Sequence, residues 1–383
     1  MNQQRRAGGR RGLIAIGAAT LLLSTLAVTD AAGAAATGDL WVATPGRGGQ
    51  SWNQQCLPDA PCPLQQALDL AAGPANAGRP VTIHLGPGTF GAATISAGTE
   101  SSLTFTGYGS SGMTATLLTP GPSAAGQLDA LRVESVSFPV TVSHLSVGPA
   151  PAAPGTAAAG ADGTTVHGIL SLSAAKLTVD DVRISGLIGG DAAAGGQSGD
   201  VIGIAHGGAT AITDTVISGL RGGAGGPGTD GATATSGGTG GLAGSVVVSL
   251  PTGADLTVNQ SQFTDNTGGR GGAGGAWSDG DHQGLPGGDG GSAVGVQANG
   301  DVASTNAVTV AGMRGGWGGT GGPGHAAQGA AQAGTDGGVG SGGEADGLLL
   351  TGVGSAAPAV LSVTNSTISD NTGGAGGTGG SGA

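Results

Sequence analysis

The stretch LTVDDVRI, residues 177–184, decides the fold, because its pattern occurs in six copies along the chain. The copies begin at residues 140, 177, 210, 256, 303 and 361. Apolar residues fall mostly at offsets 0, 2, 5 and 7, as Leu177, Val179, Val182 and Ile184 do here. Alternation within each half is typical of β-strands, and the three-residue step between the halves predicts a corner.

A further apolar run precedes most copies, for example at 168–170, 201–204 and 246–248. Three short strands in each unit describe one coil of a solenoid, because a single coil buries little surface until its neighbours stack on it. The sequence therefore predicts an all-β solenoid with inward-facing apolar residues.

Glycine-rich insertions separate the copies, and they follow offset 7. The interval grows from 37 residues (140 to 177) to 58 residues (303 to 361). The insertions contain Gly-Gly-X triplets, such as GGRGGAGGA at 268–276 and GGWGGTGGP at 315–323. This period matches the three-residue turn of a polyproline-II-type helix. We expect the insertions to form arms that leave one corner and exchange backbone hydrogen bonds; the alternative is flexible linker loops.

The composition limits the classes of function. Of 383 residues 86 are glycine, and only 9% are charged and 2% aromatic, which excludes an ordinary globular enzyme domain. The net charge of −12 opposes binding to phosphate backbones, so no nucleic-acid partner is expected. None of the frequent Gly-x-Gly patterns stands between a strand and a helix, so no nucleotide is expected either.

Residues 1–36 have the pattern of a signal peptide. Four arginines precede an apolar run at 13–28, and small residues allow cleavage near Ala34 or Ala36. Cleavage after Ala34 would remove four Arg and one Asp, leaving 8 − 23 = −15. We expect a secreted or cell-surface bacterial protein, with an uncleaved membrane anchor as the alternative. In an exported chain, Cys56 and Cys62 are expected to form a disulfide.

Residues 37–90 are interpreted as an N-terminal cap with the first strands. Leu64, Ala67, Leu68 and Ala71 share one face of a predicted helix that would cover the open strand edge. Residues 91–383 are interpreted as coils with Gly-Gly-X-rich insertions, and no C-terminal cap is visible. We expect either that the chain is a fragment or that another subunit covers this end, for example by self-association.

Several motifs resemble those of a known group of proteins. The pattern Cys-x5-Cys-x-Leu-Gln-Gln-Ala-Leu from Cys56 and the segment IHLGPGTF at 83–90 resemble the start of bacterial exported pectate-lyase-like proteins. FTDNTGG at 263–269 and ISDNTGG at 368–374 resemble repeats of polymorphic outer-membrane and autotransporter passengers. The resemblance implies a right-handed parallel β-helix. It implies little about function, because that fold carries lyases, adhesins and structural proteins.

Candidate catalytic chemistry is sparse. A β-helix polysaccharide lyase or glycoside hydrolase needs acids and a base on one face, and the best cluster is Lys176, Asp180, Asp181 and Arg183. Neighbouring acids on a strand point to opposite faces, so a solvated turn with a local ion pair is the alternative interpretation. The histidines share no metal-ligand spacing and are interpreted as surface or turn residues: His84, His144, His167, His206, His282 and His325.

The arms hold the remaining candidates. No cofactor is expected, although scattered acids leave loose calcium binding open: Asp230, Asp279, Asp281, Asp289 and Asp336. Trp277 and Trp317 are interpreted either as anchors against the coil or as ligand contacts that stack on sugars. The sequence thus predicts a non-catalytic exported protein in adhesion or assembly, with glycans or cell-surface components as partners. The alternative is a β-helix polysaccharide lyase or glycoside hydrolase.

Overall fold

The computed structural model describes residues 38–43, 56–96, 98–111, 115–123, 126–148, 161–277, 284–323, 338–352 and 359–380. The expected signal peptide, residues 1–36, lies outside these ranges. Within them, no helix has both the length and the apolar character that a membrane crossing requires.

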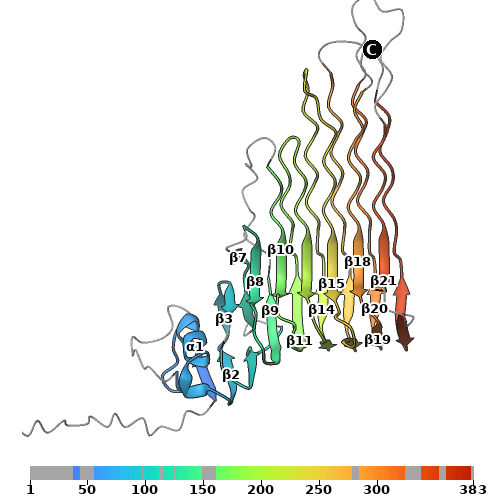
Figure 1. The fold of residues 1–383 in the computed structure, drawn as a ribbon. Helices are drawn as coiled ribbons and strands as arrows, with labels where there is room; N and C mark the ends of the chain where they lie inside the picture. The colour runs from blue at the N-terminus through green and yellow to red at the C-terminus, as the bar shows by residue number, and fades with distance from the viewer. Residues whose placement is uncertain are drawn as a thin grey trace, which may run out of the picture. The chain divides into compact units, whose positions relative to one another are not determined.

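Two long sheets run along the repeats (Figure 1). The larger sheet contains, as successive parallel neighbours, β1 (Asp39–Val42), β2 (Pro80–Leu85), β5 (Ser102–Thr106), β9 (Val140–Val147), β11 (Leu177–Ser185), β13 (Thr210–Thr213), β16 (Asp255–Asn259), β19 (Val302–Asn306) and β22 (Val360–Thr364). A continuation of it holds β3 (Gly88–Phe90), β6 (Thr116–Leu118), β14 (Val216–Ser218), β17 (Gln262–Thr264), β20 (Thr309–Ala311) and β23 (Thr367–Ser369). The arrangement is compatible with a β-helix or solenoid.

The smaller sheet is formed by the apolar runs that open the repeats. Its parallel strands are β4 (Ala93–Ile95), β8 (Leu128–Val133), β10 (Val166–Ser171), β12 (Val201–His206), β15 (Ala243–Ser249), β18 (Ala293–Asn299) and β21 (Ala345–Thr351). The short β7 (Gly121–Pro122) pairs antiparallel with β8. Each coil thus gives one strand to this sheet and two strand segments to the larger one, which confirms the three strands expected for each coil.

The predicted corner is present in all six copies, and its cause is a single backbone conformation. The residue at offset 4 has a positive φ every time, for example 47° at Asp181 and 54° at His144. This left-handed residue breaks the alternation, so that offsets 5 and 7 face inward like offsets 0 and 2. In β9 and β11 one continuous strand passes through the bend.

The core consists of rows of equivalent side chains from successive coils. Ile184, Ile217, Phe263 and Val310 follow one another in register, and each is 0% exposed. The next residue in this row, Ile368 on β23, is 47% exposed. Leu361 and Val363 on β22 are also open to solvent, although their counterparts in earlier coils are buried.

The N-terminal part contains the predicted helix. The helix α1 (Leu64–Ala71) buries Ala67, Leu68 and Ala71 and packs against β1, β2 and β4. A short 3-10 turn, Pro74–Asn76, follows it. Cys56 and Cys62 form the expected disulfide.

Candidate functional site

The glycine-rich arms extend from one corner of successive coils (Figure 1). Each arm has an outgoing segment that continues the larger sheet and a returning segment that leads into the smaller one. The outgoing segments described are 187–195, 220–231, 266–277, 313–323 and 371–380, and the returning segments are 161–165, 196–200, 234–242, 284–292 and 338–344.

Backbone hydrogen bonds join the arms into what we call the arm lattice. The first glycine of a triplet donates to the next outgoing segment, as Gly225 N–H does to Arg270 O at 2.8 Å. The second glycine donates to the returning segment of the preceding arm, as Gly269 N–H does to Gly241 O at 2.8 Å. The pattern repeats every three residues, as the Gly-Gly-X period predicts. In the described residues the arms are therefore ordered, and the flexible-linker interpretation is wrong for them.

The lattice requires glycine because the backbones approach very closely. A Cβ atom on Gly272 would lie 2.0 Å from the carbonyl oxygen of Gly226, and one on Gly319 would lie 1.8 Å from that of Gly272. No side chain fits at such positions. Only the X residues can carry side chains, and they project outward from the lattice.

Two rows of X residues lie side by side on the face formed by the outgoing segments, which we call the outgoing face. The row nearer the coil, which we call the coil-side row, is aligned by successive β-bridges through Ile188, Arg221, Thr267, Arg314 and Thr372. One triplet further out lies the tip-side row, which contains Asp191, Ala224, Arg270, Trp317 and Ala375. A groove of about 610 Å³ is lined by members of both rows and by the glycines between them.

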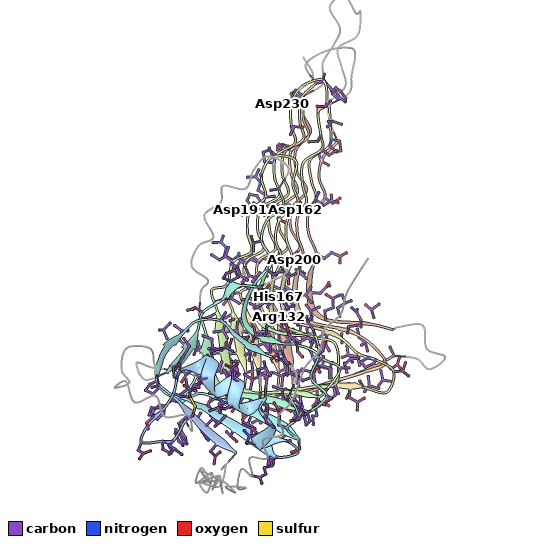
Figure 2. All side chains as sticks on the ribbon, turned by 60° about the vertical axis from the view of Figure 1, so that its left-hand side comes forward. Arg132, Asp162, His167, Asp191, Asp200 and Asp230 are labelled. Atoms are coloured by element: carbon purple, nitrogen blue, oxygen red, sulfur yellow. A yellow bond between two sulfur atoms is a disulfide. The ribbon has the colours of Figure 1, made fainter. Side chains whose placement is uncertain are left out.

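Among the described residues, most acids on the arms have a partner in the neighbouring arm. Asp191 accepts a hydrogen bond from the N–H of Ala224 at 2.7 Å, and Asp230 accepts one from Ala276 at the same distance. Asp162 and Asp200 bind the N–H groups of the next returning segment in the same way (Figure 2). The carboxylate of an acidic residue at the X position of one arm thus accepts a hydrogen bond from the outward-pointing backbone N–H of the X residue in the following arm.

The calcium candidates fit this structural role. Asp289 accepts a hydrogen bond from Ser341 N–H at 2.7 Å, so both described candidates, Asp230 and Asp289, support the lattice. Asp279, Asp281 and Asp336 lie outside the described residues. Across the described ranges, no group of three or more side chains could hold a metal ion.

The tryptophans differ in their surroundings. Trp317 is 64% exposed, so it is not an anchor against the coil, and that interpretation is wrong for it. It stands instead at the edge of the groove. Trp277 is partly buried and lies next to residues 278–283, which are outside the described ranges.

The four residues weighed as a candidate for the alternative, catalytic function are not assembled as an acid and base pair. Asp181 occupies the corner and accepts a hydrogen bond from Ser110 Oγ at 2.7 Å. Arg183 lines a separate groove of about 520 Å³ together with Ser110 and Ser146. In the described part of the chain, no ion pair joins Lys176, Asp180, Asp181 and Arg183 to one another.

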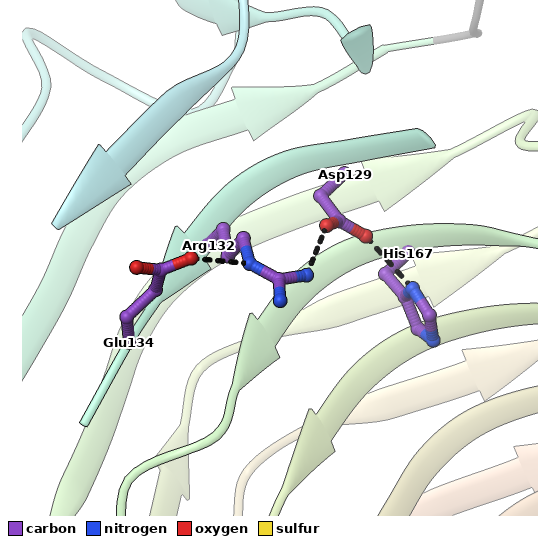
Figure 3. Close-up of polar contacts among 4 residues, drawn as sticks. All are labelled: Asp129, Arg132, Glu134 and His167. Carbon is purple, nitrogen blue, oxygen red and sulfur yellow. Dashed lines mark hydrogen bonds and ion pairs between the residues drawn. The ribbon is translucent and has the colours of Figure 1, made fainter. Parts of the chain in front are cut away.

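One ionic cluster lies where no site was expected, between β8 and β10 (Figure 3). Asp129 accepts hydrogen bonds from His167 Nδ1 at 2.8 Å and from Arg132 Nη1 at 2.9 Å, and Arg132 Nε donates to Glu134 at 3.0 Å. Burial raises the pKa of Asp129, but the hydrogen bonds from His167 and Arg132 outweigh burial, so this pKa lies below its ordinary value. Asp129 and His167 are 2% and 5% exposed, so the pair ties two strands together.

Two histidines contradict the surface interpretation. His167 is buried in the cluster just described, and His206 is 4% exposed inside the coil, in register with Ser171 and Val248. Burial lowers the pKa of His206, and nearby backbone groups offset this only in part. Neither ring nitrogen has a partner in good hydrogen-bonding geometry among the described residues. Alignment of the opening strands could have paired His167 with Asp129, which is its register neighbour, but it gives no such signal for His206, which aligns with Ser171 and Val248.

No protein-family model matches the chain, and no curated protein matches it. Inference about function therefore depends on the geometry of the arms and the coil.

Proposed function

We propose that this is a non-catalytic exported protein of the cell surface or extracellular space, which acts in adhesion or structural assembly. The arms would serve as its binding platform. The observation that carries this proposal is the arm lattice, in which the two glycine N–H groups of a triplet bond to neighbouring arms. Such bonding favours a flat, repetitive surface that can engage glycans or other cell-surface components.

The finer architecture is part of the same proposal. We infer that the coils form a right-handed parallel β-helix, because crossovers between parallel strands are right-handed in nearly all proteins. We also infer that α1 caps the first coil, and its packing against β1, β2 and β4 supports this role. An experimental structure of the protein would test both inferences directly.

Self-association at the last coil is also proposed. The side chains of Leu361, Val363 and Ile368 are 40–47% exposed there and would be buried by a further coil. Exposed apolar strand edges of this kind favour pairing with another chain. Sedimentation of the protein over a range of concentrations would reveal the association, and a monomer at all concentrations would contradict it.

A binding assay tests the platform role. Surfaces coated with cell-surface polysaccharides would be exposed to the protein and to the Gly272→Val variant, whose side chain cannot fit the lattice. We expect adhesion by the protein and a strong loss in the variant, with the coil still folded. Equal adhesion by both would contradict the proposal.

The alternative function, a β-helix polysaccharide lyase or glycoside hydrolase, has less support because its four candidate residues are not brought together. Incubation with polygalacturonate and related glycans, followed by detection of cleaved products, tests it. We expect no turnover, and sustained product formation would overturn the non-catalytic assignment.

A further inference from the structure

The groove on the outgoing face is a trough with a floor of bare glycine. Its floor contains Gly222, Gly268 and Gly315, and its two walls are the coil-side and tip-side rows. With three residues between rows and about 3.1 Å per residue, the walls are about 9 Å apart. The trough runs across four arms, or three spacings of about 4.8 Å, which gives a length of about 14 Å.

The trough is positively charged although the chain is acidic. Arg221 and Arg314 stand in one wall and Arg270 in the other, and all three side chains are exposed. Among the described residues none of these guanidinium groups has an ion-pair or hydrogen-bond partner. Asp191, the one acid in the lining, already accepts the N–H of Ala224.

Two backbone amides in the same wall are also unused. The N–H of Ala224 is satisfied by the Asp191 carboxylate, but the equivalent N–H groups of Arg270 and Trp317 have no acceptor in the described part of the chain. They lack one because the preceding residues in the row are Ala224 and Arg270 rather than an acid. The Asp191–Ala224 hydrogen bond is thus an example, within the protein, of a carboxylate bound to such an amide. The equivalent amides of Arg270 and Trp317 remain open, and they lie beside arginine side chains.

We propose that this trough binds a segment of an acidic linear polysaccharide. Its carboxylates would bind Arg221, Arg270 and Arg314 and the open amides, because guanidinium groups and outward N–H groups favour carboxylates. One sugar ring would stack on Trp317, which is 64% exposed at the end of the trough. This inference rests on the proposed function, because it requires the arms to be an ordered platform.

The floor argues for a polysaccharide over an acidic peptide. The floor amides are bonded within the lattice, for example Gly222 N–H to Thr267 O at 2.9 Å and Gly315 N–H to Thr372 O at 3.0 Å. They are therefore not available to pair with an added strand.

Calorimetric titration of the purified protein tests the proposal. The probes are short oligomers of mannuronate and galacturonate, with their methyl esters as neutral controls of the same shape. We expect binding of the acids and little binding of the esters. Arg270→Gln should weaken binding by about tenfold or more, since it removes a charge-assisted hydrogen bond. Trp317→Ala should weaken it as well, and added NaCl should reduce the affinity.

The matched control is Arg183→Gln, which removes a basic side chain that lines a different groove and should leave the affinity unchanged. Hydrogen exchange of the arm amides in every variant shows whether the lattice is intact. Protected arms with no binding of either acid would overturn this inference alone, whereas unprotected arms would overturn the platform itself. Equal binding of acid and ester, tighter binding of hexaglutamate, or loss of binding in Arg183→Gln would also refute the trough assignment.

Discussion

Successive coils and successive arms stack in the same register, but different interactions stabilise the two stacks. In the coil, rows of apolar side chains such as Ile217 and Phe263 are fully buried. In the Gly-Gly-X triplets of the arms, no side chain lies between neighbouring backbones, and the glycine backbones bond directly to one another. The coil therefore depends on burial of apolar surface, whereas the arms depend on hydrogen bonds that only glycine permits.

The coil and the arms also differ in the substitutions that they tolerate. A coil can replace one apolar residue with another of similar volume, because packing is tolerant of such exchanges. A lattice glycine has no substitute, because even a methyl group would meet a neighbouring carbonyl oxygen. Conversely, the X positions of the arms accept residues as different as Arg, Trp, Thr and Asp.

The largest effect is expected from the coil. Phe263→Ala removes a fully buried ring and should lower the free energy of unfolding by about 3–5 kcal/mol. Denaturant unfolding followed by circular dichroism measures this loss. A change below about 1 kcal/mol would show that the coil is not held by its apolar rows.

A smaller and more local effect is expected in the arms. Gly272→Ala places a methyl group 2.0 Å from Gly226 O and should cost about 1–3 kcal/mol in the lattice. Hydrogen exchange of residues 266–277 should accelerate, while the coil strands stay protected. The control is Gly379→Ala, whose added Cβ would meet nothing within 4 Å. Equal effects of the two variants would refute the close-packed lattice.

Acidification should weaken the coil before it affects the ionic cluster. The pKa of His206 is lowered in the folded protein, so the unfolded chain binds the proton more readily. The contribution of neutral His206 to the free energy of unfolding is therefore fully present above the ordinary histidine pKa, about 6.5. It is lost as the pH falls below that value. The midpoint of thermal unfolding should drop between pH 7.5 and pH 5, and His206→Leu should flatten that dependence. If the unfolding midpoint of His206→Leu depended on pH as that of the parent protein does, His206 would not be the group responsible.

The smallest effect is expected from the acids of the arms. Asp289→Ala removes one exposed carboxylate from the N–H of Ser341 and should cost less than about 1 kcal/mol. Because Asp230 and Asp289 already bind amides, addition of calcium or of a chelator should leave the unfolding midpoint unchanged. A calcium-dependent rise in that midpoint would restore the metal interpretation.

The features that repeat along the sequence could be predicted from it. The burial of individual polar residues could not. Offsets 0, 2, 5 and 7 in LTVDDVRI determine which side chains face inward, and the three-residue step marks the corner at Asp181. Gly-Gly-X determines which amides bond between arms. The apolar period gave no sign of His206 or of the Asp129–His167 pair, because a buried polar residue interrupts that period; only alignment of the opening strands places Asp129 beside His167.

The candidate site was predictable only in part. The sequence marked Trp317 but not its neighbours, because Arg221, Arg270 and Arg314 are 44 to 49 residues apart and meet only when the arms stack in register. It left loose calcium binding by the arm acids open and did not show that Asp230 and Asp289 bind backbone amides, since those amides belong to other arms. Register between coils, rather than local sequence, decides which X residues share a wall.

Residue-resolved hydrogen exchange across residues 220–277 and 313–323 tests the central claim most directly. We expect slow exchange at lattice amides such as Gly223, Gly269, Gly272 and Gly319, which bond to neighbouring arms. We expect fast exchange at Arg270 and Trp317, whose outward amides have no acceptor among the described residues. Uniformly fast exchange throughout the arms would contradict the account, because the platform and its trough exist only if the lattice does.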